Sequence, residues 1–264
     1  MRLDSSTLLA TVLLAFSNLL NAGDYEIAVQ PVLPEEEIKE AYQPLVDYLS
    51  KTTGHTFTIK TYKNFLTYWE RMKKKAGFDF VLDAAHFTDW RIKRHKYKVI
   101  AKFPDSVSFS LVTHEDNLIF DAEELVLSKI ATMPSPGLGA VRLNEIYPNP
   151  VRIPLYVQSS DAVTAVQKVI DGKADAAIIP TPLMNGFENL NLVETTKLVP
   201  HMGFSVSSEI PGSVVSEVRK ALVDAPKTDE GRKMLSNINI EYFQEANNAT
   251  YDGYAVLLED VFGY

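Results

Sequence analysis

The sequence of 264 residues contains no cysteine. This absence excludes disulfides, thiolate catalysis, cysteine-based zinc sites and a lipid-anchoring cysteine after a leader segment. Positive charge is also scarce, because 26 Lys and Arg residues stand against 34 Asp and Glu residues, for a net charge of -8. Nucleic acid is therefore not an expected partner, since surfaces that bind it need clustered positive charge.

Long apolar runs are rare as well. One lies near the N-terminus at residues 8–20 and is short for a membrane span, and no later stretch is apolar enough to cross a bilayer. Small residues follow it at Ala22 and Gly23. We interpret residues 1–22 as a signal peptide cleaved after Ala22, which predicts an exported protein. The alternative is an uncleaved N-terminal membrane anchor.

The first part of the mature chain alternates strand and helix patterns. Apolar, strand-like runs cover residues 25–29, 57–61 and 78–82, and helical periodicity covers 35–50, the residues after Asn64, and 84–93. Asn64 is predicted to cap its helix, with Trp69 on the buried face. This βαβαβα order predicts a mostly parallel sheet with helices on both faces.

A second cycle follows two β-rich runs, 97–103 and 108–113, which we interpret as crossing strands. The sequence therefore predicts an α/β protein with two lobes, each a mostly parallel sheet flanked by helices, joined by a hinge of two crossing strands. Lobe one is predicted to comprise residues 23–107 plus 208–264, and lobe two residues 108–207. The carboxyl ends of both sheets would then face a shared cleft, where open α/β sheets bind ligands.

Residues 125–147 combine an apolar run, a turn of proline, serine and glycine, and an amphipathic helix. In this arrangement the unpaired N–H groups of the first helical turn point toward one spot. Such a spot suits a small anion or polar ligand. The segment therefore predicts a small-ligand site at its turn, residues 133–137.

Three segments together carry a family resemblance. They are EAYQPLVDYLSKTTGHTFTIKTYKNFLTYWERM, FDFVLDAAHFTDWRIKRHKYKVIAK and VQSSDAVTAVQKVIDGKADAAIIP. Their order resembles the phosphate/phosphite/phosphonate type of periplasmic substrate-binding protein over residues 25–222. The resemblance implies a type II two-lobed fold in the periplasm, a monomer without a cofactor, and a small polar solute, such as a phosphonate-like oxyanion, delivered to the membrane permease of an ABC transporter.

The family's ligand pattern is only partly present in this chain. Ser135 and Gly137 remain of the family's hydroxyl-rich turn, whereas Pro134 and Pro136 each remove an N–H donor from it. At the start of the next helix the family commonly has Ser-His-Asp-Ala, where this chain has Ser159-Ser160-Asp161-Ala162. The predicted second-lobe ligand residues are therefore Ser135, Gly137, Ser159, Ser160 and Thr181, while Asp161 is predicted to cap its own helix.

In the first lobe the residues after the third strand form a separate candidate group. His86 lies at a strand-to-helix junction, where its imidazole could bond an oxyanion. We predict Tyr62, Asp83, His86 and Phe87 as ligand residues. The alternatives are that His86 only caps or packs at the helix start, and that Phe87, like Trp69, serves the core.

Catalysis and metal binding are not expected. Ser135, His86 and Asp83 supply the residue types of a hydrolase triad, but no Gly-x-Ser-x-Gly motif surrounds any serine. The five histidines show no metal-ligand spacing. The sequence therefore predicts a solute-binding protein that is not an enzyme. The alternative is an exported sensor of the same fold that reports to a membrane signalling partner.

Overall fold

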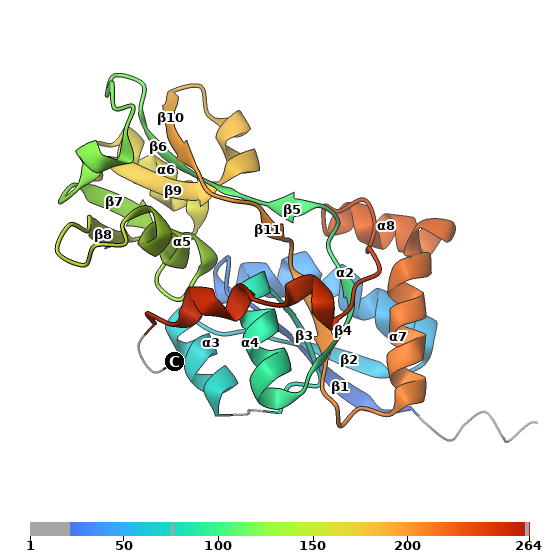
Figure 1. Cartoon of the computed structure of the whole chain (residues 1–264). Helices are drawn as coiled ribbons and strands as arrows, with labels where there is room; N and C mark the ends of the chain where they lie inside the picture. Colours follow the sequence, from blue (N-terminus) through green and yellow to red (C-terminus); the bar gives the residue numbers. More distant parts are fainter. Residues whose placement is uncertain (1–21, 75–76, 262–263) are drawn as a thin grey trace, which may run out of the picture.

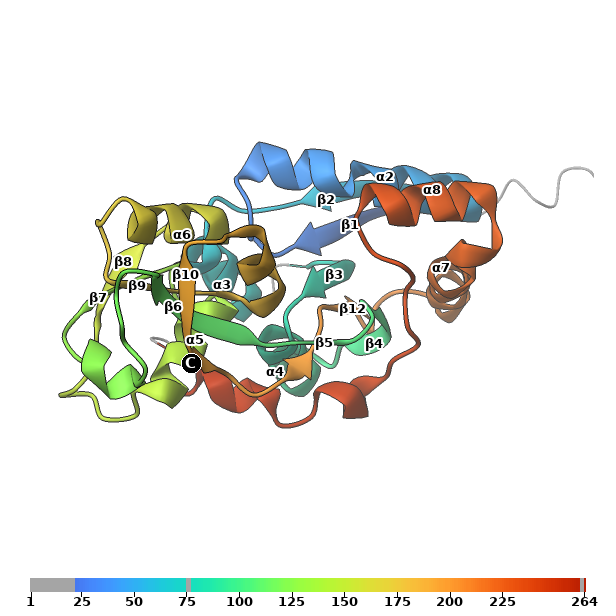
Figure 2. The same ribbon diagram turned by 90° about the horizontal axis from the view of Figure 1, so that it is seen from above.

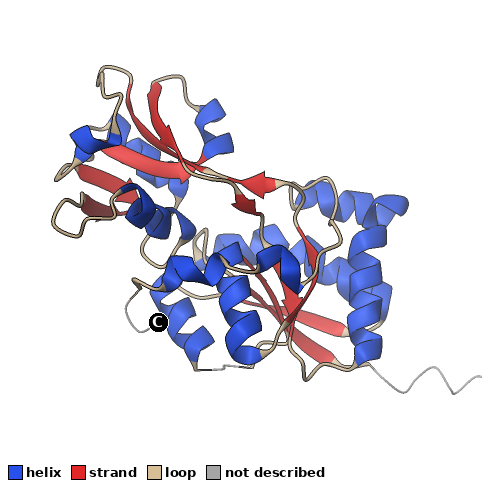
Figure 3. Ribbon diagram, in the orientation of Figure 1, coloured by secondary structure: helices blue, strands red, loops and turns tan. Residues whose placement is uncertain are grey.

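The computed structural model describes residues 22–74, 77–261 and 264. Two lobes, each built on a five-stranded sheet, are joined by two crossing segments (Figure 1). Helices flank the sheets of both lobes (Figure 3). The predicted signal peptide lies outside the described residues apart from Ala22. Within the described part of the chain, no helix combines the length and apolar character needed to cross a membrane.

The first sheet has the strand order β2-β1-β3-β12-β4. Its strands are β1 (Asp24–Val29), β2 (Thr56–Lys60), β3 (Phe80–Asp83), β4 (Lys98–Lys102) and β12 (Gly203–Val206). β1 is parallel to β2 and β3, whereas β12 is antiparallel to both of its neighbours. The βαβαβα pattern thus produces the predicted parallel strands β1, β2 and β3. Strand β12, which comes after the second lobe in the sequence, is added to the same sheet.

Helices cover both faces of this sheet. They are α2 (Glu35–Thr53), α3 (Phe65–Lys73), α4 (Ala85–His95), α7 (Gly212–Asp224) and α8 (Asp229–Asn237). Adjacent residues of β1 serve opposite faces, since Ile27 packs in the cluster with α2, α7 and α8 while Ala28 packs in the cluster with α3 and α4. The predicted cap of α3 is confirmed, because the Asn64 side chain accepts a hydrogen bond from the Thr67 N–H.

The second sheet has the order β10-β6-β9-β7-β8. Its strands are β6 (Phe109–His114), β7 (Lys129–Thr132), β8 (Leu155–Gln158), β9 (Ala176–Pro180) and β10 (Leu190–Thr195). β7, β8 and β9 are parallel, and β6 is antiparallel to β9 and β10. The helices α5 (Leu138–Ile146) and α6 (Ala162–Ile170) accompany the short 3₁₀ helices η1 (Ala122–Leu125) and η2 (Thr181–Gly186).

The hinge consists of β5 (Ser106–Val107) and β11 (Val199–Pro200), which pair antiparallel between the lobes. A hinge of two crossing strands is thus present, but not at the predicted runs 97–103 and 108–113, because those runs form β4 of the first sheet and β6 of the second. The predicted end of lobe two at residue 207 places β12 with the wrong sheet, because β12 pairs with β3 and β4 of the first lobe. The β-rich run 199–207 is in fact two strands, and its composition gives no sign of the change of sheet between them.

The lobes also share a hydrophobic cluster beside the hinge. Leu138 and Val141 of α5 pack with residues of α3 and α4, including Phe65. The C-terminal 3₁₀ helix η5 (Tyr254–Leu258) contacts both α4 and α5. In the view from above, this C-terminal segment runs along the first lobe toward α5 (Figure 2). The start of α5 is therefore held against the first lobe by apolar packing.

Candidate functional site

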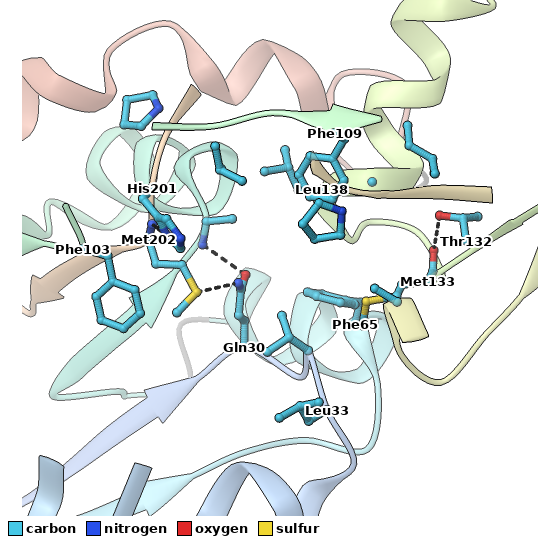
Figure 4. Close-up of a pocket in the computed structure, with 18 of the residues that line it drawn as sticks. Gln30, Leu33, Phe65, Phe103, Phe109, Thr132, Met133, Leu138, His201 and Met202 are labelled. Atoms are coloured by element: carbon cyan, nitrogen blue, oxygen red, sulfur yellow. Dashed lines mark hydrogen bonds between the residues drawn. The ribbon is translucent and has the colours of Figure 1, made fainter. Parts of the chain in front are cut away.

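A cavity of about 340 Å³ lies between the lobes. Its walls come from the β1–α2 loop, the start of α3, the hinge segments, strand β6, the β7–α5 turn and the start of α6 (Figure 4). The volume falls at the lower end of the range typical of small-molecule sites, about 300 to 1,000 Å³. Both lobes and the hinge contribute to this cavity, so a molecule that fills it would touch all three.

Aromatic and aliphatic side chains dominate this cavity. Figure 4 shows Phe65, Phe109 and Leu138 around its centre and Phe103 and Met202 toward the hinge. Among the described residues, no Arg, Lys, Asp or Glu lines it. The wall is therefore apolar and carries no formal charge from a side chain at neutral pH unless a histidine is protonated.

Two polar side chains of the cavity already have partners. The Gln30 amide nitrogen donates to the Met202 sulfur at 3.0 Å, and its carbonyl oxygen accepts the Ala84 N–H at 3.1 Å. The Thr132 hydroxyl donates to the Met133 carbonyl at 3.1 Å. These groups fix the shape of the wall, because each is committed to a contact within the protein.

His201 is the titratable group at the hinge end of the cavity. The Met202 N–H donates to His201 Nδ1 at 2.7 Å, so Nδ1 is an acceptor and the proton of the neutral ring lies on Nε2. Burial, with a further effect from nearby Lys102, lowers the pKa of His201 below its usual 6.5. The ring is therefore neutral at pH 7 and leaves one N–H donor free of partners among the described residues.

Tyr42 of α2 supplies a second polar group to the same cavity. Burial raises the pKa of Tyr42 to about 12, so its phenol stays protonated. The hydroxyl has no hydrogen-bond partner among the described residues. The cavity thus combines an apolar wall with two neutral groups able to bond a ligand.

A second hollow of about 250 Å³ adjoins this cavity and shares Leu33, Phe65 and Met133 with it. Ser159 lines this hollow, and its buried hydroxyl has no hydrogen-bond partner among the described residues. Lys63 and Glu35, both exposed, lie on the same wall. Opposite charges therefore accompany the polar groups of the second hollow.

The predicted first-lobe ligand residue Asp83 belongs to a buried network instead. Its carboxylate pairs with Arg91 and accepts hydrogen bonds from Tyr68 at 2.6 Å and Thr88 at 2.9 Å. Arg91 also donates to Ser205 at 3.2 Å. Burial alone would lower the pKa of Arg91, but the Asp83 carboxylate outweighs this effect and raises it. Both oxygens of the Asp83 carboxylate are engaged inside lobe one, although Arg91 Nε is buried without a hydrogen-bond partner among the described residues. Asp83 does not line the cavity.

His86 is fully buried at the junction of the lobes. Its Nε2 lies 2.9 Å from the Pro136 carbonyl oxygen, to which it donates because a carbonyl can only accept. Burial lowers the pKa of His86 to about 4. The structure therefore brings His86 and the predicted second-lobe turn together, but as a contact between the lobes and outside the cavity lining.

Phe87 and Tyr62 also lie outside the cavity lining. Phe87 is fully buried and its ring contacts those of Phe65, Tyr68 and Trp69, which is the core role left open by the sequence. Tyr62 lines a separate hollow together with Glu26 and Lys60. Its ring contacts those of Tyr68 and Phe78.

The turn before α5 is packed rather than open. Ser135 is exposed to solvent, while Gly137 is buried. A Cβ at Gly137 would lie 3.0 Å from the Phe65 ring and 3.0 Å from the Pro134 carbonyl, so a larger residue would be tightly packed at this position. The Gly137 N–H donates to the Pro134 carbonyl at 2.9 Å. With two prolines in the turn, the N–H groups of Met133 and Ser135 are the ones left without a backbone partner among the described residues.

The remaining predicted residues lie near the cavity but outside its lining. Ser160 donates to Asp161 at 2.6 Å, and Asp161 accepts the Thr164 N–H at 2.7 Å, which confirms that Asp161 caps α6. Thr181 lies within 2.8 Å of the Ser108 hydroxyl and accepts from Ser110 at 3.0 Å. Ser159 and Ser160 border the second hollow, and Thr181 ties β9 to β6 at the rim.

The residues that line the cavity were mostly absent from the sequence-based set. Phe65 is predicted by its helical spacing only as a core residue, and His201 appears only in the histidine count. One usable signal was the position of Phe103 and Phe109 beside the hinge strands, since residues flanking a hinge face the cleft that it closes. Apolar type alone cannot separate a cavity wall from a core.

The hydrolase arrangement is not assembled. Within the described residues, no hydrogen bond joins His86 to Asp83 or Ser135, since Asp83 pairs with Arg91 and His86 bonds Pro136. Across the described ranges, no group of three or more His, Asp or Glu side chains is placed to hold a metal ion. The geometry around the cavity is suited to holding a ligand through non-covalent contacts.

Three solved structures resemble the whole two-lobed arrangement. PA3383 of Pseudomonas aeruginosa, a binding-protein component of an ABC phosphonate transporter, has 13% identity and a TM-score of 0.73, covering 88% of this chain and 84% of its own. PhnD1 of Prochlorococcus marinus, in complex with methylphosphonate, has 13% identity and a TM-score of 0.75, covering 89% and 97%. XAC2383 of Xanthomonas citri, bound to ATP, has 11% identity and a TM-score of 0.71, covering 89% and 95%.

At these identities the structures show the type II binding-protein fold alone. A comparison with curated proteins gives no match. A family model for the periplasmic substrate-binding protein of phosphonate ABC transporters matches residues 27–251, most of the chain. Proteins of this family bind a transported substrate and are not enzymes. This chain therefore belongs to the periplasmic substrate-binding proteins of the phosphonate ABC transporter family.

Proposed function

We propose that the protein captures a small solute in the cavity between its lobes and delivers it to the membrane permease of an ABC transporter. The observation that carries this proposal is the cavity lined by both lobes and the hinge. A ligand that contacts both lobes stabilises the form in which they are close together, and the permease can then distinguish loaded from empty protein. No feature of the described residues favours the alternative of a sensor.

The test is a thermal-shift screen of the mature protein against phosphate, phosphonates, sulfonates, carboxylates and neutral organic solutes. A ligand that binds only the native state raises the melting temperature. Ala162 lines the cavity at the first residue of α6. The variant Ala162→Phe should abolish the shift by filling the space.

Val163 provides the matched control, because it follows Ala162 on the same helix and is 54% exposed. Val163→Phe should keep the wild-type shift. A shift that survives in Ala162→Phe would place the ligand elsewhere, and a panel without any shift in the wild type would contradict solute binding.

Export to the periplasm, cleavage after Ala22 and a monomeric state complete the proposal. N-terminal sequencing of the secreted protein should begin at Gly23, whereas a protein retained in the membrane at its full length would favour the uncleaved anchor. Light scattering of the mature protein should give the mass of one chain. Uptake of the identified solute should be lost when the gene is deleted and restored by the wild type but not by Ala162→Phe.

A further inference from the structure

The cavity between the lobes has the character of a site for an apolar molecule. Phe65, Phe109 and Leu138 present apolar surface from two lobes, and Phe103 closes the hinge end (Figure 4). Burial of apolar ligand surface against such a wall is favourable at about 25 cal/mol per Å². Aromatic rings add a preference for flat ligands that stack on them or meet them at the edge. The bulk of a well-matched ligand is therefore apolar.

The same cavity is poorly equipped for a doubly charged anion. A phosphate-like group carries about -1.5 to -2 charges at neutral pH, and among the described residues no Lys or Arg lines the cavity. Nearby Lys102 is committed elsewhere, since its ammonium group donates to the carbonyls of Phe103 at 3.0 Å and Asp105 at 2.8 Å. An anion buried there would need several free hydrogen-bond donors in place of a cation, and the Gln30 and Thr132 donors are already bonded within the protein.

Main-chain N–H donors do not make up for the missing positive charge. Pro134 and Pro136 have no N–H, and the Gly137 N–H already bonds the Pro134 carbonyl. Leu138 and Gly139, in the first turn of α5, do line the cavity. The first residues of α3 and α6 also line it, but the N-termini of these helices are already capped by the Asn64 side chain and the Asp161 carboxylate. The uncapped N-terminus of α5 offers roughly half a positive charge, which is well short of balancing a dianion.

The adjoining hollow does not supply the missing charge. Lys63 is present there, but Glu35 lies on the same wall. Ser160 already donates to the Asp161 carboxylate, which adds a second negative group beside it. The charges around the second hollow therefore offset one another.

What the cavity does offer is neutral hydrogen bonding, from His201 at its hinge end and from Tyr42 of α2. The free Nε2–H of His201 is a donor, because Nδ1 is occupied by the Met202 N–H. The Tyr42 hydroxyl can donate or accept. A ligand with one acceptor oxygen can satisfy His201 while the rest of the molecule stays in apolar contact.

We propose that the cavity selects an uncharged molecule with an aromatic or aliphatic body and one hydrogen-bond acceptor, such as a carbonyl oxygen bonded by His201. This proposal rests on the proposed function, since it names the solute class for the same cavity. The family description names phosphonate. This chain retains the fold of its family with a cavity of different chemistry.

The test compares matched pairs of probes by isothermal titration calorimetry. Acetophenone is paired with phenylphosphonate, and 2-hexanone with butylphosphonate. The two members of each pair share the same apolar group, phenyl or butyl, and differ in the polar group, ketone or phosphonate. Methylphosphonate is included as a phosphonate anion without a large apolar group. Each ketone should bind at least tenfold more tightly than its phosphonate partner, and methylphosphonate should bind least.

A phosphonate that binds more tightly than its ketone would overturn the inference and leave the solute-binding function intact. If no probe binds and the thermal-shift panel also fails, both the inference and the proposed function are contradicted. If a charged solute from that panel binds and Ala162→Phe removes its binding, only the inference falls.

Two pairs of variants locate the effect in this cavity. Met133 is half-buried and lines the wall, so Met133→Lys places a cation there and Met133→Gln serves as the uncharged control of similar length. Phenylphosphonate should bind the Lys variant at least tenfold more tightly than the Gln variant, and equal binding would place the ligand outside this cavity. His201→Phe should weaken acetophenone binding about fivefold, the effect of one neutral hydrogen bond, while His201→Gln, which keeps a donor, should retain more of it.

Discussion

The buried network under α4 and the cavity between the lobes lie close together but have opposite chemistry. The network gathers Asp83, Arg91 and Tyr68, and its polar groups bond one another. The cavity is lined mainly by apolar groups, and its few free polar atoms are neutral. This difference teaches that polar residues at a strand end indicate a ligand site only when they lack partners, because a satisfied polar group is a structural element.

The largest expected effect comes from breaking the network. Arg91→Met leaves the Asp83 carboxylate buried without its cation, so the free energy of unfolding should fall by about 3 to 5 kcal/mol. Urea denaturation followed by circular dichroism measures this loss. Arg232→Met is the control, because Arg232 pairs with Asp229 on the surface and should change stability little.

The double variant Asp83→Leu/Arg91→Met sharpens the result. Removing both charges should recover part of the lost stability, since the cost lies in the unpaired charge. A single Arg91→Met variant as stable as Arg232→Met would contradict the structural role given to the network.

The next effect concerns pH and the contact between the lobes. His86 has a pKa of about 4 in the folded protein and 6.5 as its ordinary value. Below pH 6.5 the unfolded chain takes up a proton that the folded chain refuses, so stability is lost as the pH falls from 6.5 toward 4. Between pH 7.5 and 5 this group should cost about 2 kcal/mol.

The variant His86→Gln keeps a donor for the Pro136 carbonyl but cannot titrate. Urea denaturation at both pH values should therefore show a smaller loss in the variant than in the wild type, by about 2 kcal/mol. Equal losses in the two proteins would show that His86 takes up its proton as easily when folded as when unfolded.

A smaller effect tests the apolar packing that joins α5 to the first lobe. Val141 is buried in the cluster with Phe65 and Trp69. Val141→Ala removes the equivalent of two methylene groups and should lower the free energy of unfolding by about 1.5 kcal/mol. Thermal and urea denaturation give this value, and the exposed Val163→Ala should stay close to wild type. Similar values for the two variants would mean that α5 is not part of a shared core.

The smallest effect concerns the cavity wall itself. Gly139 lies in α5, and an added Cβ would sit 3.4 Å from Phe109 and 3.6 Å from Ile178, which is ordinary contact. Gly139→Ala should raise the free energy of unfolding by about 0.5 kcal/mol, because alanine loses less backbone entropy in a helix. A clear loss of stability in urea would show that the wall at Gly139 is too tight for a methyl group.

Much of the fold was predictable because its signals are local. Strand β7 and helix α5 both lie within residues 125–147, where the sequence predicts an apolar run, a turn and a helix, and Asn64 and Asp161 cap their helices as expected. Apolar spacing and capping are properties of short segments, so they survive without knowledge of the rest of the chain. Strand β10 was missed because, of its six residues, only Leu190 is buried, which leaves little apolar pattern to detect.

The candidate site was much less predictable. Ser135, His86 and Asp83 have the right residue types at the right strand ends, yet their side chains are exposed, bonded to Pro136 and paired with Arg91, respectively. Their partners lie up to 50 residues away in the chain. Which polar group remains free depends on those distant partners, and no local pattern contains that information.

The sequence by itself determined two α/β lobes and a hinge of crossing strands, since alternation of elements and apolar spacing are encoded locally. The resemblance of three segments, taken in order, indicated the solute-binding family. The sequence also determined the loss of donors at Pro134 and Pro136, because proline has no N–H wherever it lies. Only the tertiary structure decided what lines the space between the lobes. That choice depends on which faces of Phe65, Phe109 and Leu138 remain uncovered after distant segments have packed, and this is a property of the assembled core.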